Sequence, residues 1–399
     1  MSRGDNLEAI VAAKAPGAGG FSRLSAGCEG AFPTKIVEAL EVLARAAGPA
    51  GAAAARLLDD ARVPGKEGPA WDPRLPLPHP ADLDWRFTRE TADRLIDAAL
   101  DGIPARGTVL AVAVPTVVTR LVERETSHRI VFAARPDDPV TTALRSWAPD
   151  GVVFIDAASD LRSVEADVSL VDPPWYDDVA LPLVRQAASG TKLGGAVLVC
   201  GPDRLTGCSA AARLAELPQQ PLQFGLRAAR IAGRRPRYDT PLFELNTLEA
   251  AGVLNADPKW RTGRLFVGEA LGPSQVGPED VPAAPAWREH VFGTCRARLP
   301  AGAPGCYADR VEFSVRPIVG RLRGAERIPS IWTSGNRTSD ALPSGVPHER
   351  ASAGMIALTR AAEIENAEAR SRLRPWRSSL LKGGGLVEPP PDKHAMIYA

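Results

Sequence analysis

Short apolar runs alternate with helix-length segments through the middle of this chain, and they constrain its fold more than any other feature. The runs occupy residues 108–114, 129–134, 151–155, 167–171 and 195–200, with helical patterns at 115–125, 139–147 and 178–189. Apolar and polar residues do not alternate within the runs, so each strand should be covered on both faces. Helices that connect parallel strands provide such cover. The sequence therefore predicts an α/β protein with a doubly wound parallel sheet.

The fourth of these runs ends in an unusual set of side chains, Asp172, Pro173, Pro174 and Trp175. Two consecutive prolines cannot donate to a sheet ladder, so they end the strand and hold the neighbouring carbonyls in one direction. An ionised Asp accepts hydrogen bonds, and Trp offers a flat surface for stacking. In doubly wound sheets ligands bind beyond the carboxyl ends of the strands. This combination is suited to holding a planar amine.

The Asp172-Pro173-Pro174-Trp175 sequence resembles the signature of the class I S-adenosylmethionine-dependent amino-methyltransferases, in its adenine-N6 form. The resemblance implies a Rossmann-like methyltransferase domain over residues 105–270, S-adenosylmethionine as cofactor and a DNA or RNA substrate. Asp172 and the Pro173 carbonyl would hold the exocyclic amine, Trp175 would stack on the base and Tyr176 would add a second wall. A base within a duplex would first have to be flipped out.

The same resemblance assigns the cofactor to the turns that follow the first three strands. The family's first turn is rich in glycine, whereas Val114, Pro115 and Thr116 would hold the methionine part of the cofactor here. The acidic residue that usually closes the second strand is displaced to Asp137. Asp156 follows the third strand, where it would meet the adenine amine of the cofactor or would equally well cap its own loop.

Three interpretations of the chain remain open from its sequence. One is a working methyltransferase whose first turn is built without glycine. A second is an aminopropyltransferase that resembles the branched-chain polyamine synthases, which also place a helical domain before a Rossmann-like domain with Asp-Pro-Pro. Those enzymes carry an acidic cluster after the first strand, and this chain has none there. The third is a catalytically degenerate descendant that binds a nucleotide or a protein partner, because fold alone does not fix function.

Further candidates for the substrate side lie later in the chain. Tyr238, Trp260 and Arg261 flank the last expected strands of the sheet, where this family walls its substrate site. Tyr238 and Trp260 fit equally well as core residues. Asn336 and Arg337 belong to a polar loop that could cover an active site or form an ordinary hairpin turn.

Composition limits the partners and the location of the protein. The net charge of +1 does not by itself indicate a nucleic-acid partner. Five cysteines without a CxxC spacing fit a reducing cytoplasm, and five scattered histidines predict no metal site. No apolar stretch approaches the roughly 20 residues that span a bilayer. We therefore expect a cytoplasmic protein without metal or membrane contacts.

Changes in composition divide the chain into segments. Residues 1–30 are small, polar and rich in glycine, and they are expected to be disordered. A small helical N-terminal domain, through which protein partners could bind, is expected at 31–68, followed by a linker and packing helix at 69–104. The Rossmann-like domain covers 105–270, a C-terminal extension 271–373 and a disordered tail 374–399.

Overall fold

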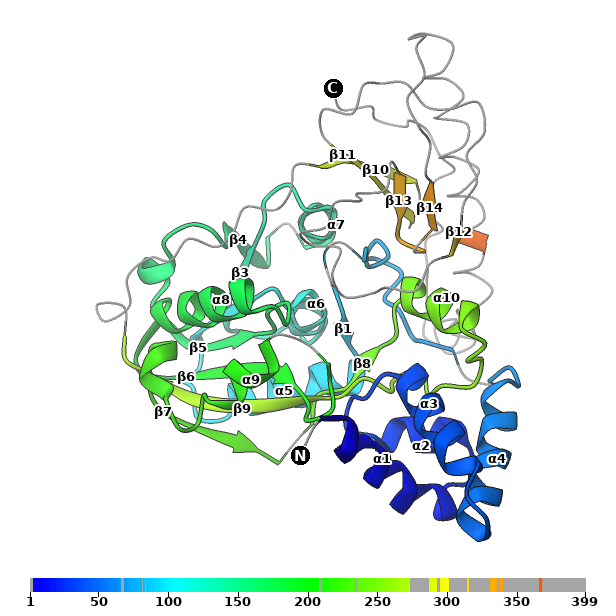
Figure 1. Ribbon diagram of the computed structural model, residues 1–399. Coiled ribbons are helices and arrows are strands. Elements are labelled where there is room, and N and C mark those ends of the chain that lie inside the picture. Colours follow the sequence, from blue (N-terminus) through cyan, green and yellow to red (C-terminus); the bar gives the residue numbers. More distant parts are fainter. Residues whose placement is uncertain are drawn as a thin grey trace, which may run out of the picture.

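A computed structural model describes most of the first two thirds of the chain and parts of the remainder. The described residues are 3–272, apart from 66, 67, 81, 83, 149, 208, 209 and 234, together with 287–292, 295–300, 314–315, 331–335, 337–339 and 366–367. Figure 1 shows an N-terminal group of helices, a central sheet with helices on it, and a second sheet formed by C-terminal strands. The predicted tail at 374–399 lies outside the described residues.

The central sheet is doubly wound, as the sequence predicts, and is extended by two further strands through antiparallel pairing. Among the described residues, seven strands form it in the order β4-β3-β2-β5-β6-β9-β7. They are β2 (Thr108–Val112), β3 (Arg129–Ala134), β4 (Val152–Asp156), β5 (Ala166–Val171), β6 (Thr191–Pro202), β7 (Leu226–Ala232) and β9 (Gly263–Ala270). The first five are parallel, and β9 lies antiparallel to β6 and β7. Strand order reverses between β2 and β5, so this is a Rossmann-like methyltransferase fold.

Helices cover the sheet because successive parallel strands need crossover connections. α5 packs against α6 and β5, α6 against β2 and β3, and α7 against β4, whereas α8 packs against β5 and β6 and α9 against β6. The bounds are α5 (Arg89–Leu100), α6 (Pro115–Glu123), α7 (Pro139–Trp147), α8 (Asp177–Ser189) and α9 (Ala210–Ala215). Short 3-10 turns add η2 (Leu161–Val164) and η3 (Pro221–Phe224). With cover on both sides, every residue from Val109 to Val112 is fully buried, as the unalternated apolar run predicts.

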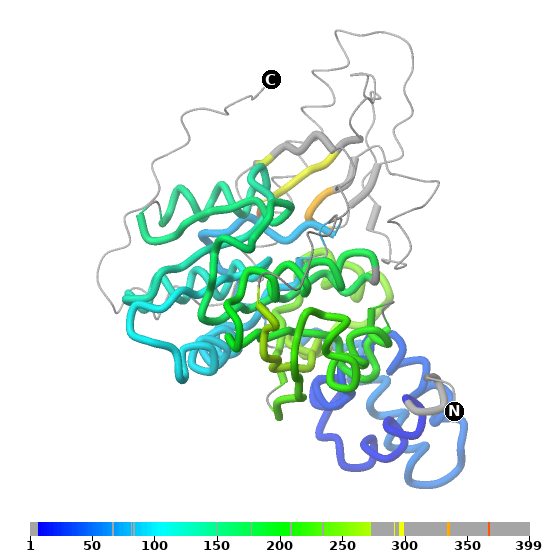
Figure 2. Tube along the Cα trace, turned by 90° about the vertical axis from the view of Figure 1, so that its left-hand side faces the viewer, coloured from blue at the N-terminus to red at the C-terminus, as the bar shows by residue number. Residues whose placement is uncertain are grey.

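The predicted disorder of residues 1–30 is wrong for the part that the structure describes. α1 (Arg3–Lys14), η1 (Ala15–Gly17) and α2 (Phe21–Gly27) pack with α3 (Pro33–Ala44) and α4 (Pro49–Ala61) into one bundle, drawn in blue in Figures 1 and 2. Val11, Phe21 and Leu24 are buried in its core. Apolar residues at helical spacing outweigh the glycine-rich composition here, because burial of a helix face stabilises even short helices.

The expected linker after this bundle is extended but not solvated. Residues 75–80 are buried, and Trp71 donates its indole N–H to the Thr240 carbonyl at 3.0 Å. The segment then forms β1 (Arg86–Phe87), which pairs antiparallel with β8 (Tyr238–Asp239) just before α10 (Leu242–Ala250). This pairing carries the linker back over the sheet and places Tyr238 near the end of β5.

The described part of the C-terminal extension forms a second sheet, of five strands in the order β10-β11-β13-β14-β12. They are β10 (Trp287–Phe292), β11 (Cys295–Pro300), β12 (Ser314–Val315), β13 (Ile331–Thr333) and β14 (Arg337–Ser339). Asp82 of the linker joins this sheet to the central domain, because its carboxylate accepts from Arg135, Arg296 and Arg298. Burial alone would raise the pKa of Asp82, but the three guanidinium groups outweigh it and hold that pKa well below its usual range.

Candidate functional site

The Asp-Pro-Pro-Trp motif lies at the carboxyl end of β5, in the middle of the sheet. Val171 is the last residue of that strand and pairs with Val112 of β2 and Val199 of β6. The Pro174 carbonyl accepts from the Tyr176 N–H at 2.8 Å, and Tyr176 begins α8 as its N-cap. The motif is therefore a rigid turn between a central strand and a helix, as the two prolines predict.

Asp172 is the residue of this turn that carries an ionisable side chain. The Tyr238 hydroxyl donates to one carboxylate oxygen, Oδ1, at 2.9 Å. The residue keeps some surface exposure, although its carboxyl is desolvated. Burial raises the pKa of Asp172 well above its ordinary value, against the Tyr238 hydrogen bond and the charge of Arg261. Burial also raises the pKa of Tyr238, so its hydroxyl stays protonated and remains the donor.

Arg261 fills the space beside Trp175. Its guanidinium carbon lies 4.4 Å from the centre of the Trp175 ring and 4.1 Å from that of Trp85. Two indoles thus flank one planar cation, an arrangement that cation–π attraction stabilises. We call the space between Trp85 and Trp175 the acceptor slot. Tyr238 closes its inner side, edge-on to Trp175 with ring centres 5.5 Å apart.

A second buried carboxyl belongs to the same region. Glu244, in the first turn of α10, is only 4% exposed. Burial raises its pKa to about 7, and the positive charge of Arg261 opposes that shift. The positive charge of Arg261, which occupies the acceptor slot, therefore acts to lower the pKa of both Glu244 and Asp172. Two desolvated acids beside the two indole faces that hold Arg261 make a site that favours positive charge.

Trp260 takes the core role that its sequence also allowed. It is fully buried, with its ring 5.5 Å from Trp85 and 5.2 Å from Phe32 of the N-terminal bundle. It supports Trp85 from behind, so its contribution to the acceptor slot is indirect.

The turn after β2 has a backbone conformation that glycine adopts more readily than other residues. Ala113 has φ +55, which lies in the left-handed region, and Val114 then caps α6 with Pro115 as its first residue. The backbone thus follows the course expected of a glycine turn, but a methyl group remains where the family leaves space. Thr116 lies in the first turn of α6, where N–H groups have no partner within the helix and can bind a ligand.

The turn after β3, where the resemblance places the ribose of a cofactor, differs from the family pattern in structure as well as in sequence. The residue that follows β3 is Arg135, whose guanidinium binds Asp82 and Asp138. Asp138 is occupied as the N-cap of α7, because it accepts from the Val140 N–H at 2.8 Å. Asp137, the next acidic residue after β3, is exposed.

Asp156 closes β4 as predicted and is exposed. Its Oδ1 accepts from the Ala158 N–H at 2.9 Å. This is the loop-capping role that the sequence left open.

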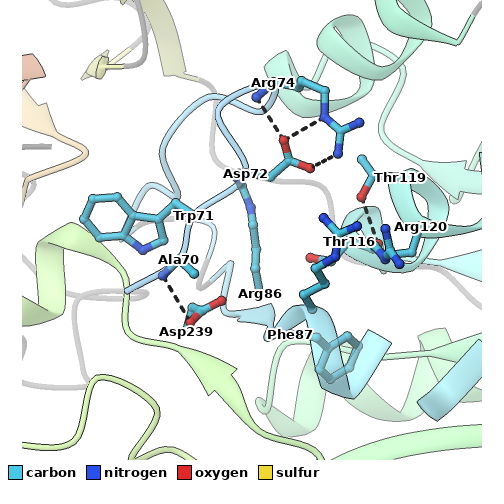
Figure 3. A pocket seen from close by; sticks show the side chains of 11 residues that line it. Ala70, Trp71, Asp72, Arg74, Arg86, Phe87, Thr116, Thr119, Arg120 and Asp239 are labelled. Carbon is cyan, nitrogen blue, oxygen red and sulfur yellow. Dashed lines mark hydrogen bonds and ion pairs between the residues drawn. The ribbon is translucent and has the colours of Figure 1, made fainter. Parts of the chain in front are cut away.

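A hollow lies next to this edge, between the linker and α6 (Figure 3). It encloses about 430 Å³, counting the open space at its mouth. Thr116 is among the residues around it, whereas Asp137 and Asp172 are not. Its lining is rich in arginine, with Arg74, Arg86, Arg89 and Arg120. Arg74 pairs with Asp72 and Arg120 with Asp93, so these charges are largely balanced.

The remaining candidates do not gather at the slot in the described structure. Asn336 lies outside the described residues, and Arg337 is the first residue of β14. β13 and β14 pair antiparallel, so this segment is the hairpin that its turn residues allowed. Asn246 of α10 donates to the Gly335 carbonyl at 2.8 Å, which docks that hairpin on the helix that carries Glu244.

Two negative findings apply to the described part of the chain. Within it, His, Cys, Asp and Glu side chains form no group of three or more that could hold a metal ion. None of its helices combines the length and the hydropathy needed to cross a membrane.

Comparison with known proteins shows similarity in fold alone. No protein-family model and no curated protein matches the chain. The solved branched-chain polyamine synthase of Thermus thermophilus, in complex with N4-aminopropylspermidine and 5'-methylthioadenosine, is 16% identical with a TM-score of 0.48, over 69% of this chain and 90% of that one. An O-methyltransferase family protein from Burkholderia thailandensis is 13% identical with a TM-score of 0.30, over 46% and 57%.

A third solved structure is the geranyl diphosphate C-methyltransferase of Streptomyces coelicolor A3(2), in complex with Mg2+, geranyl diphosphate and S-adenosyl-L-homocysteine. It is 12% identical with a TM-score of 0.30, over 45% of this chain and 76% of that one. Likeness this distant supports no conclusion about activity. The class of the protein, a Rossmann-like methyltransferase fold, therefore rests on the strand order of the central sheet.

Proposed function

We propose that this protein transfers a methyl group from S-adenosylmethionine to an amine held at Asp172. The observation that carries the proposal is the state of that carboxyl at the end of β5. One oxygen is oriented by Tyr238, the group is desolvated, and an indole wall stands beside it. Binding sites of doubly wound sheets lie at this edge and at this switch point.

The roles of the side chains follow from the proton that an amine must lose. Methyl transfer breaks a carbon–sulfur bond and forms a carbon–nitrogen bond, after which the nitrogen releases a proton. Asp172 would take that proton, and a carboxylate with a raised pKa is a stronger base than an ordinary one. Tyr238 would keep Asp172 turned toward the slot, and Trp175 would hold the acceptor against it. Placement of this kind can lower a barrier by about 7 to 11 kcal/mol in favourable cases.

The donor would lie beyond the ends of β2, β3 and β4. Bound there, S-adenosylmethionine would supply an electrophilic methyl carbon. The left-handed backbone at Ala113 and the first turn of α6 support this assignment, with Thr116, Asp137 and Asp156 as the groups that would hold it. The expectation that the acceptor is an adenine in DNA or RNA stays a prediction from the motif.

A second candidate function is a binding module that has lost catalysis. The ion pair between Arg135 and Asp82 favours this function. In the methyltransferase family an acidic residue that binds the ribose follows the second strand, whereas here an arginine that is already paired follows it. In that case Asp172 would have a structural role through Tyr238 alone.

Transfer of a labelled methyl group tests the proposal. Purified protein is incubated with labelled S-adenosylmethionine and DNA, RNA or small amines. We expect incorporation by the wild type and a loss of about 100-fold in Asp172→Asn, because the general base is removed. Tyr238→Phe should lose about tenfold, the value of one hydrogen bond to an ionised group. Asp160→Asn, at an exposed ion pair, is the matched control. Equal incorporation by the wild type and folded Asp172→Asn would contradict the proposal.

A further inference from the structure

The occupant of the acceptor slot is itself informative. Arg261 places a flat, positively charged group between Trp85 and Trp175, at 4.1 and 4.4 Å from their ring centres. The side chain extends from the residue just before Thr262, which bridges to Arg237. Arg261 is half-buried, so the slot that it occupies is not sealed from solvent.

The charged side chains around the acceptor slot determine which kind of group could replace Arg261 there. Asp172 and Glu244 are desolvated carboxyls, and for both of them the charge of Arg261 favours the ionised form. Asp84, whose charge also acts on Asp172, is paired with Arg86 at 2.8 Å. If Arg261 moved out, a neutral ring could restore the stacking, but both buried carboxyls would then take up protons. A second cation would instead keep the carboxyls ionised and would retain both the charge attraction and the cation–π contacts that now hold Arg261.

From this geometry we propose that the acceptor amine reaches the slot as a nitrogen cation, an ammonium or guanidinium group, and that Arg261 holds its place until it binds. A protonated nitrogen has no lone pair with which to attack, so Asp172 would take one proton from the cation before the methyl group is transferred. The methylated nitrogen then carries the positive charge that the sulfonium loses when its carbon–sulfur bond breaks. The inference rests on the proposed function, since it names the class of acceptor for the same site. It assigns Glu244 as a specificity-determining residue that compensates the cation, and Trp85 and Trp175 as its two walls.

Binding measurements without a methyl donor test the inference separately from transfer. Agmatine supplies a guanidinium and 1,4-diaminobutane an ammonium group, while adenosine is the neutral aromatic amine. Affinities are measured by titration calorimetry for wild type, Arg261→Ala and Arg261→Ala/Glu244→Gln. Arg162→Ala, which removes an exposed arginine charge, is the control. Circular dichroism establishes that each variant is folded.

We expect Arg261→Ala to bind the two cations about tenfold more tightly than the wild type, in keeping with the loss of one competing cation–π contact. The added Glu244→Gln change should reverse most of that gain, and adenosine should gain nothing. A gain for adenosine alone, or no gain for any probe by folded Arg261→Ala, would overturn the inference. Because the donor is absent, failure here leaves labelled transfer to a neutral acceptor possible, and that result would preserve the proposed function.

Discussion

At the scale of single residues, burial sets the chemistry of this site. Asp172, Glu244 and Asp239 are acids inside the protein, and burial raises the pKa of each. An acid whose pKa is raised in the folded state destabilises that state as pH rises between its two pKa values, because only the unfolded chain then ionises freely. These three acids therefore lower the stability of the fold as pH rises toward neutral and basic values.

Glu244→Gln should remove one part of that pH dependence. The pKa of Glu244 moves from an ordinary 4.5 to about 7, so the penalty develops between those pH values and is absent below them. The variant should match the wild type at about pH 4 and exceed its free energy of unfolding by up to about 3 kcal/mol at about pH 8. Urea unfolding at both pH values measures this.

The exposed Glu41→Gln variant, on α3, serves as the control and should stay within about 0.5 kcal/mol at both values. Equal stability of Glu244→Gln and the wild type at high pH would show that Glu244 is ionised without cost.

At the scale of elements, the turn between β2 and α6 carries the clearest conflict between residue and backbone. Ala113 occupies the left-handed region at φ +55, where an L side chain is strained. Replacement by glycine should therefore stabilise the protein, although glycine also gains more freedom in the unfolded chain.

We expect Ala113→Gly to raise the free energy of unfolding by about 1 kcal/mol. Ala111→Gly, two residues earlier and fully buried within β2, should lower it by about 1 kcal/mol or more. Chemical unfolding of both variants gives the comparison. A loss of stability in both would mean that the methyl group of Ala113 makes packing contacts that outweigh the strain.

At the same scale, the strands of the sheet could be predicted because each one is marked by its own short run of apolar residues. Unalternated apolar runs gave β2 to β6, and the two prolines placed Asp172 at a strand end. Tyr238 and Arg261 were candidates, but their meeting with Asp172 was not foreseeable from spacing. Trp85 and Asp82 were missed, since a linker that returns across a sheet through one short pairing leaves no periodic pattern. Trp85 stands between Asp84 and Arg86, and an aromatic residue among charges was the only available signal.

At the scale of the whole molecule, the linker joins parts that are distant in sequence. Its Trp85 forms a wall of the acceptor slot, and its Asp82 bonds to Arg296 and Arg298 in the C-terminal sheet. Both arginines are almost completely buried. Removal of one partner of a buried ion pair is strongly destabilising, because the other partner then keeps a buried charge that the lost group no longer compensates.

Asp82→Ala should accordingly lower the free energy of unfolding by about 3 kcal/mol or more. Asp160→Ala removes an acid from the exposed pair with Arg162 and should cost less than about 1 kcal/mol. Thermal and urea unfolding of the two variants distinguish these outcomes. A small effect of Asp82→Ala would mean that other contacts hold the C-terminal sheet in place.

The central claim, that this fold still accepts a sulfonium donor next to Asp172, is tested most directly by titration calorimetry with S-adenosylmethionine and S-adenosylhomocysteine. We predict measurable heat for both ligands with the wild type and weaker binding by Asp137→Ala, which removes the exposed acid at the end of β3. Absence of heat and of any thermal stabilisation with either ligand would contradict the account and favour the binding module.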